Sequence, residues 1–273
     1  MCEAWRGTAM ADSAERRNLW PEHPDYRVDF VPTEKRVRGV HAGTTIVDST
    51  NARLMLETGH TPVYYFPASE VRLDLLSPNS SSTFCPFKGE ASYWDLSVGG
   101  QHLKDAVWSY REPFPETRSI QGWLAFYWNA LEHWYEEDEE VFVHPRNPYV
   151  RIDVRQTSRP VRVLAGGATV AESTRARLLF ETGHPTRFYL PPEDVRTDLL
   201  RPSQTTSGCP YKGFARYWSL ELEGASWPDL VWSYPTPFDE VRRVADYLCF
   251  YEERCDAVEL DGERRARPSA PTR

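Results

Sequence analysis

Two short motifs that could carry chemistry share the pattern Cys-Pro-x-Lys-Gly, at residues 85–89 and 209–213. A cysteine near a lysine can act as a nucleophile when its thiol is deprotonated, which would make Cys209 a catalytic residue. Alternatively, Lys212 and its counterpart Lys88 can bind a carboxylate or a phosphate as point charges. The pattern also suits a tight turn, because proline fixes φ, glycine permits positive φ and cysteine packs as a small apolar residue. The residues leave all three interpretations open.

A second motif, Glu-Thr-Gly-His, contains Glu57 and His60 in one copy and Glu181 and His184 in the other. A carboxylate and an imidazole three residues apart can perform acid–base chemistry, with Glu181 as the catalytic group and the histidine on the ligand. The alternative is a histidine in a turn beside a glutamate that belongs to a structural ion pair. A metal site would need a third ligand, and the motif supplies none.

Aromatic residues and an arginine accompany these motifs. Tyr189, Tyr217 and Trp232 belong to runs with strand-like spacing, and they could line a pocket for a planar ligand. Arg187 would then hold an anionic group next to Lys212. The alternative for the aromatic residues is packing in the core, which is their commoner role.

The elements that must position these residues come from a sequence that occurs twice, at a shift of about 124 residues. Each copy has an ordinary domain size, and we expect domains at 24–143 and 149–260 with a proline-punctuated linker near 144–148. Two similar domains in one chain commonly imitate a two-fold dimer. We therefore expect a pseudo-two-fold intrachain dimer that functions as a monomer, with a ligand cleft at its interface.

Short strand-like runs alternate with turn signals in each copy, and aromatic residues make up 13% of the chain. The expected fold is mainly β, at the border with the α+β class. We expect each copy to form a small barrel or sandwich. Residues 49–58 fit either a capped helix or a strand. We favour the strand because the neighbouring runs are strands.

Three runs in the second copy resemble the family DUF427. Residues 181–195 are similar to the family pattern ETG-x-P-x-R-Y-Y-x-P-x-x-D-V. Residues 207–217 are similar to T-x-C-P-Y-K-G-x-A-x-Y, and residues 232–237 are similar to W-S-Y-x-x-P. The first copy departs from the pattern, because Thr61-Pro62-Val63 replaces Pro-x-Arg and Phe87 replaces tyrosine. The resemblance implies a compact β-rich fold and no established reaction. Although the family is sometimes labelled nucleotidyltransferase-like, the chain has neither paired Asp-x-Asp metal ligands nor a Gly-rich phosphate loop.

Composition excludes several classes of function. A net charge of −8 disfavours a nucleic-acid partner, which requires a basic face. The five cysteines include no Cys-x-x-Cys pair, so we expect no metal site of that kind. With no apolar run of membrane-spanning length and no signal peptide, we expect a soluble cytoplasmic protein without a membrane partner. The motifs specify no cofactor.

Three functions follow from these residues. The favoured one is a protein that binds, and could act on, a small anionic metabolite in a pocket lined by lysine, glutamate, arginine and aromatic residues. Lys212, Arg187 and Glu181 form its main site, while Lys88 and Glu57 form a second or vestigial one. The first alternative is a non-catalytic interaction module with a repeated aromatic face. The second alternative is a thiol-dependent enzyme that uses Cys209.

Overall fold

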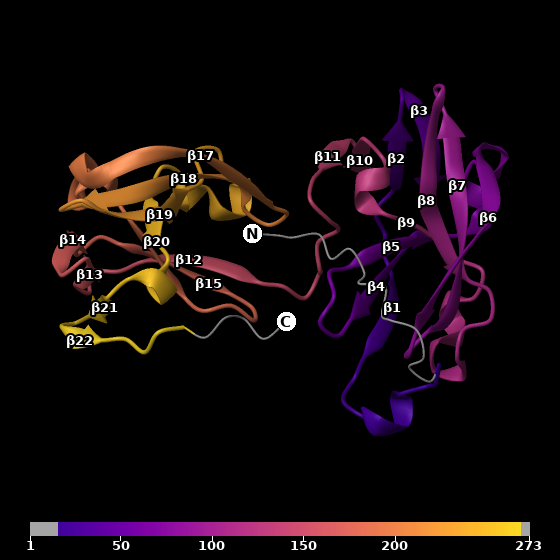
Figure 1. Cartoon of the computed structure of the whole chain (residues 1–273), viewed down its shortest axis with the longest axis horizontal. Coiled ribbons are helices and arrows are strands. Elements are labelled where there is room, and N and C mark those ends of the chain that lie inside the picture. The colour runs from indigo at the N-terminus through magenta and orange to yellow at the C-terminus, as the bar shows by residue number, and fades with distance from the viewer. Residues whose placement is uncertain (1–15, 269–273) are drawn as a thin grey trace. The chain divides into compact units, whose positions relative to one another are not determined.

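The computed structural model describes residues 16–268, which form two compact units. The first unit ends at Asn147 and the second begins at Pro148. In Figure 1 the first unit runs from indigo to magenta and the second from pink through orange to yellow. Each unit contains one large and one small antiparallel sheet, so the protein is mainly β, as expected.

The first unit has a seven-stranded sheet in the order β1-β4-β5-β9-β8-β7-β6 and a four-stranded sheet in the order β11-β10-β2-β3. Its strands are β1 Val28–Pro32, β2 Val37–His41, β3 Thr44–Ser49, β4 Arg53–Glu57, β5 Val63–Phe66, β6 Leu76–Cys85, β7 Gly89–Val98, β8 Gln101–Tyr110, β9 Leu124–Phe126, β10 His133–Glu136 and β11 Glu139–Val141. Its helices are single short 3₁₀ segments: η1 Trp20–Glu22, η2 Ala68–Glu70, η3 Leu73–Leu75, η4 Pro115–Ile120 and η5 Trp128–Ala130.

The second unit repeats this plan, with sheets ordered β12-β15-β16-β20-β19-β18-β17 and β14-β13-β21-β22. Its strands are β12 Ile152–Gln156, β13 Val161–Ala165, β14 Ala168–Ser173, β15 Arg177–Glu181, β16 Arg187–Leu190, β17 Leu200–Cys209, β18 Gly213–Leu222, β19 Ala225–Ser233, β20 Leu248–Phe250, β21 Ala257–Leu260 and β22 Glu263–Arg264. Its 3₁₀ segments are η6 Pro192–Asp194, η7 Thr197–Leu199, η8 Asp239–Val244 and η9 Glu252–Arg254.

Alternation along the strands gives the large sheet two different buried faces. Adjacent residues of a strand point to opposite faces, so Tyr64 joins the core between the two sheets while Tyr65 joins a second cluster. Val107 and Trp108 of β8 divide in the same way. The second cluster includes Ile120 of η4 but no residue of the small sheet. This outer face of the large sheet carries most of the residues whose side chains could take part in binding or catalysis.

The structure decides two points that the sequence left open. Residues 53–57 and 177–181 are strands, as favoured for this segment. The described strands form a sandwich-like pair of open sheets and no closed barrel, because β1 pairs only with β4 and β6 only with β7. The barrel alternative is therefore wrong. Within the described residues, no helix has the length and apolar character needed to cross a bilayer.

Candidate functional site

The Cys-Pro-x-Lys-Gly motif forms the turn that joins the last two strands of each large sheet. Lys88 donates its backbone N–H to the carbonyl of Cys85 at 3.2 Å. Gly89 has φ of +95°, and a Cβ there would lie 3.4 Å from the carbonyl oxygen of Glu112. Gly213 occupies the same conformation, with φ of +100°. The positive φ therefore favours glycine at both positions, and the turn gives the lysine a fixed direction.

That direction leads to the glutamate of the second motif. Lys88 forms an ion pair with Glu57, and both side chains are only 8% exposed. In the second unit Lys212 Nζ lies 2.6 Å from Glu181 Oε2, with side chains 12% and 8% exposed. Three strands separate β4 from β7, which is about 19 Å in a flat sheet. The sheet must therefore curl for the pair to form across its outer face.

A belt of hydrogen-bonded aromatic residues surrounds each pair. Trp108 Nε1 donates to the Tyr65 hydroxyl at 3.1 Å, and Trp232 Nε1 donates to the Tyr189 hydroxyl at 3.2 Å. A hydroxyl pair joins Thr83 to Tyr93, and another joins Ser207 to Tyr217, both at 2.7 Å. The belt is completed by Tyr110 and Tyr127 in the first unit and by their counterparts Tyr234 and Tyr251 in the second. The two units thus build one contact pattern twice.

The tyrosines of the belt are neutral hydrogen-bonding groups. Burial raises the pKa of Tyr65, Tyr110, Tyr189 and Tyr234 well above the ordinary value, with the nearby glutamate adding a smaller effect in the same direction. Their hydroxyls therefore keep their protons at neutral pH. They offer both donors and acceptors next to the ion pair.

An arginine enters the site only in the second unit. Arg187 lies against the Trp232 ring, 5.7 Å from its centroid, and binds both oxygens of Glu253 at 2.7 and 3.0 Å. Burial opposes its charge, but the hydrogen bonds to Glu253 and other nearby acidic groups raise the pKa of Arg187 above its usual value. In the first unit Val63 and Asn129 take these two positions.

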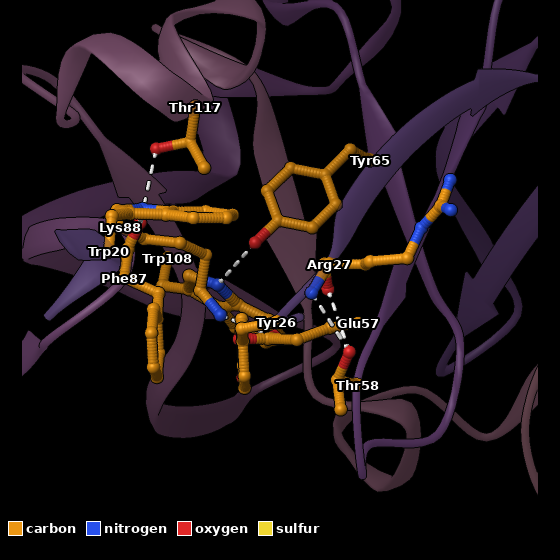
Figure 2. A network of polar contacts seen from close by, with 10 residues as sticks. All are labelled: Trp20, Tyr26, Arg27, Glu57, Thr58, Tyr65, Phe87, Lys88, Trp108 and Thr117. Atoms are coloured by element: carbon orange, nitrogen blue, oxygen red, sulfur yellow. Dashed lines mark hydrogen bonds and ion pairs between the residues drawn. The ribbon is translucent and has the colours of Figure 1, made fainter. Parts of the chain in front are cut away.

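A segment of the chain covers the site of the first unit. The Tyr26 hydroxyl donates to Glu57 Oε1 at 2.7 Å, and the Tyr26 ring stacks on Phe87 with centroids 3.6 Å apart. Trp20 Nε1 donates to the carbonyl of Phe87 at 2.8 Å. Figure 2 shows these side chains converging with Lys88 on one small region. Sequence reasoning missed this segment, because it lies before the repeated motifs.

The cysteines and histidines of the motifs differ in placement. Cys209 is half-buried at the end of β17 beside the aromatic belt, and in the described residues no histidine hydrogen-bonds to its thiol. His60 and His184 are exposed in the turns after β4 and β15. Their imidazoles therefore lie outside the cluster that joins Glu57 to Lys88 and Glu181 to Lys212. His184 Nδ1 is hydrogen-bonded to the carbonyl of Thr182 in its own turn.

The two side chains of each ion pair are at most 12% exposed. Two hollows of about 590 and 320 Å³ in the first unit lie elsewhere, one beside His102 and the other beside Trp94 and Arg111. Among residues 16–268, no group of three or more histidine, cysteine or acidic side chains is placed to hold a metal ion. A ligand at the ion pair must therefore enter by moving a side chain or a covering segment.

Sequence comparison finds one matching family. The family described as a domain of unknown function, DUF427, matches the chain twice, over residues 29–137 and 153–261. None of the curated proteins matches the chain. The two matches fall within the two units, so each unit carries one copy of the Lys–Glu pair and its aromatic belt.

Proposed function

Because the chain belongs to the DUF427 family, to which no reaction is assigned, we propose its function from the site itself: it binds a small anionic metabolite at the buried Lys–Glu pair. One observation carries the proposal. The same ion pair and hydrogen-bonded belt occur in both units, on the sheet face that the small sheet does not cover. Burying two charges costs free energy that apolar packing would not, so two such sites favour a role beyond stability.

Lys212 is the main anion-binding group in this proposal. An ammonium has three donors, and Lys212 gives one of them to Glu181, which leaves donors for a ligand oxygen. Arg187 supplies a second cation when the ligand competes with Glu253. Glu181 would then move a proton to or from the bound molecule, while Tyr189, Tyr217 and Trp232 hold its apolar part. In the first unit Lys88 and Glu57 form the corresponding, covered site.

The remaining features of the proposal follow from composition. The negative net charge favours a small ligand over a nucleic acid, and one chain already contains two sites, so a monomer suffices. The protein would act in the cytoplasm. No cofactor is assigned. The exposed positions of His60 and His184 give them at most a role at the rim of a site.

A ligand screen by thermal shift tests the proposal, with nucleotides, sugar phosphates and carboxylic acids as the library. A ligand at about 100 times its Kd adds roughly 2.7 kcal/mol, which is a shift of several degrees. We expect the Glu181→Gln/Lys212→Met variant to lose the shift. Arg196→Ala removes an exposed ion pair of the same unit and should keep it.

Two results would contradict the proposal. A shift that survives in Glu181→Gln/Lys212→Met would place the ligand elsewhere. A folded protein that responds to no compound would favour the interaction module. Cys209→Ser separates the thiol-dependent alternative, because binding through Lys212 and Arg187 does not require the thiol.

A further inference from the structure

The segment that covers the first site is bound there by specific contacts. Leu19 donates its N–H to the carbonyl of Pro86 at 3.0 Å, and Trp20 Nε1 donates to the next carbonyl, that of Phe87. The rings of Trp20 and His23 approach the Phe87 ring edge-on, while the Tyr26 ring lies flat on it. The segment thus contacts both the backbone and a side chain of the turn that carries Lys88.

Tyr26 completes the hydrogen bonding of the buried carboxylate. Its hydroxyl donates to one oxygen of Glu57, and Lys88 donates to the other (Figure 2). Burial, followed by the hydrogen bond to Glu57, raises the pKa of Tyr26 far above its ordinary value, so the phenol remains a donor. The stacking fixes the plane of the Tyr26 ring, and the hydrogen bond to a charged acceptor fixes its hydroxyl.

The second unit shows that the fold does not need this phenol. Val150 takes the position of Tyr26 in the repeat and has no hydroxyl. Within the described residues, Lys212 is the only side chain hydrogen-bonded to Glu181. The ion pair, the turn and the aromatic belt all form there. Tyr26 is therefore an addition to the site and not a part of its frame.

We propose that the first site is a receptor for a phenol ring and that Tyr26 is its resident ligand. The segment Trp20–Tyr26 closes the site until a para-substituted phenol displaces it. The proposal rests on the proposed function in treating the Lys–Glu pair as a binding site, but it concerns the first unit and a neutral ligand. Val63 supplies no second cation where the second unit has Arg187, so the first site favours a donor to Glu57 over an anion.

The proposal is tested by removing the Tyr26 ring and measuring whether p-cresol binds in its place. This compound has the size and shape of the tyrosine side chain. We expect the full-length Tyr26→Ala protein to bind p-cresol in NMR titrations. Toluene, which lacks the hydroxyl, should bind roughly ten- to a hundredfold more weakly, because it makes no hydrogen bond to Glu57. Wild-type protein should bind p-cresol at least about tenfold more weakly than Tyr26→Ala does, because the compound must first displace the Tyr26 ring.

A matched variant controls for binding at any hole left by a lost ring. Tyr135 lies in the same unit under the guanidinium of Arg38, away from the site, so Tyr135→Ala should not bind p-cresol. A peptide of residues 16–27 distinguishes a peptide ligand from a free phenol. If its affinity for Tyr26→Ala exceeds that of p-cresol at least tenfold, the contacts of Leu19 and Trp20 count, and a tyrosine-bearing peptide is the class of ligand.

Four outcomes would overturn the proposal. Equal affinity for p-cresol and toluene would show that Glu57 does not bind the phenol hydroxyl. No affinity in a folded Tyr26→Ala protein would show that the site is not a receptor for a phenol ring. An unfolded Tyr26→Ala protein would make Tyr26 a structural residue. A milder variant adds an independent readout: Tyr26→Phe should speed amide exchange of Leu19 by about tenfold or more, and unchanged exchange would contradict the proposal. None of these variants alters Lys212 or Glu181, so their failure leaves the anion site of the second unit untouched.

Discussion

The two units keep the same frame around their ion pairs and differ at its edge. The indole–phenol bond that Trp108 makes in the first unit and Trp232 in the second differs by only 0.1 Å, 3.1 against 3.2 Å. At the edge, the first unit has Tyr26 on its carboxylate where the second has Val150, and lacks the cation that Arg187 provides. The same frame therefore forms two different sites. In the first unit Tyr26 donates a hydrogen bond to the carboxylate, and in the second unit Arg187 adds a cation.

Residues that form an ion pair at the edge of the second site are replaced together in the first unit. Arg187 and Glu253 of the second unit are both replaced in the first, by Val63 and Asn129. A lone charge left in a partly buried position is costly, so the two charges are expected to be present or absent together. The same reasoning explains why Lys88 and Glu57 occur together in the first unit even though its site is covered.

Loss of the lysine should have the largest effect and should differ between the units. Lys212→Met leaves the buried Glu181 without its cation, and we expect a loss of about 3–5 kcal/mol in stability of the second unit. Lys88→Met should cost the first unit about 1–2 kcal/mol less, because Tyr26 still donates to Glu57. Hydrogen exchange of the β4 and β15 amides measures each unit separately. Equal losses would contradict the role given to Tyr26.

Breaking the arginine pair should have a smaller effect. Arg187→Val leaves Glu253 without its partner in a partly exposed position, and we expect a loss of about 1–2 kcal/mol. Adding Glu253→Asn recreates the combination found in the first unit, and stability should return to within about 0.5 kcal/mol of wild type. Urea unfolding of the single and double variants checks this. A double variant as unstable as Arg187→Val would show that the two residues are not coupled.

A buried carboxylate in the second unit should make stability depend on pH. In the described residues neither oxygen of Glu252 has a hydrogen bond, and burial raises its pKa, partly offset by Arg265. A raised folded pKa means that the stability Glu252 contributes is present below its unfolded pKa and is lost as pH rises through the folded value.

Glu252→Gln should therefore be more stable than wild type by about 1 kcal/mol at pH 8. The difference should vanish below about pH 4, where the unfolded glutamate is protonated as well. Denaturant unfolding across this range measures it. A difference that is independent of pH would assign the effect to packing.

The exposed histidines should have the smallest effect. His184→Ala and His60→Ala should change stability by less than about 0.5 kcal/mol, because neither imidazole contacts the ion pair. Ligand affinity should change in neither unit. A loss of binding in His184→Ala that leaves stability intact would restore this histidine to the site.

The local structure could be predicted from the sequence, but the assembly of the site could not. The strand at 53–57 was favoured because the neighbouring runs are strands, and the turn at Lys88 was one of the interpretations that the proline and glycine of the motif allowed. Their meeting could not be predicted, because it depends on the curl of a seven-stranded sheet, and Glu57 and Lys88 lie on non-adjacent strands. Tyr127 was missed although Tyr251 repeats it at the same shift, which was a usable signal. Tyr26 left no such signal, since Val150 replaces it.

Titration calorimetry of one anionic compound from the screen against two double variants tests whether the Lys–Glu pair of the second unit is the binding site. We expect Glu181→Gln/Lys212→Met to abolish binding and Glu57→Gln/Lys88→Met to leave it unchanged, because Tyr26 already occupies the first site. Equal losses in the two variants would contradict the difference between the units. Unchanged binding in both would show that the Lys–Glu pairs are not the sites of ligand binding.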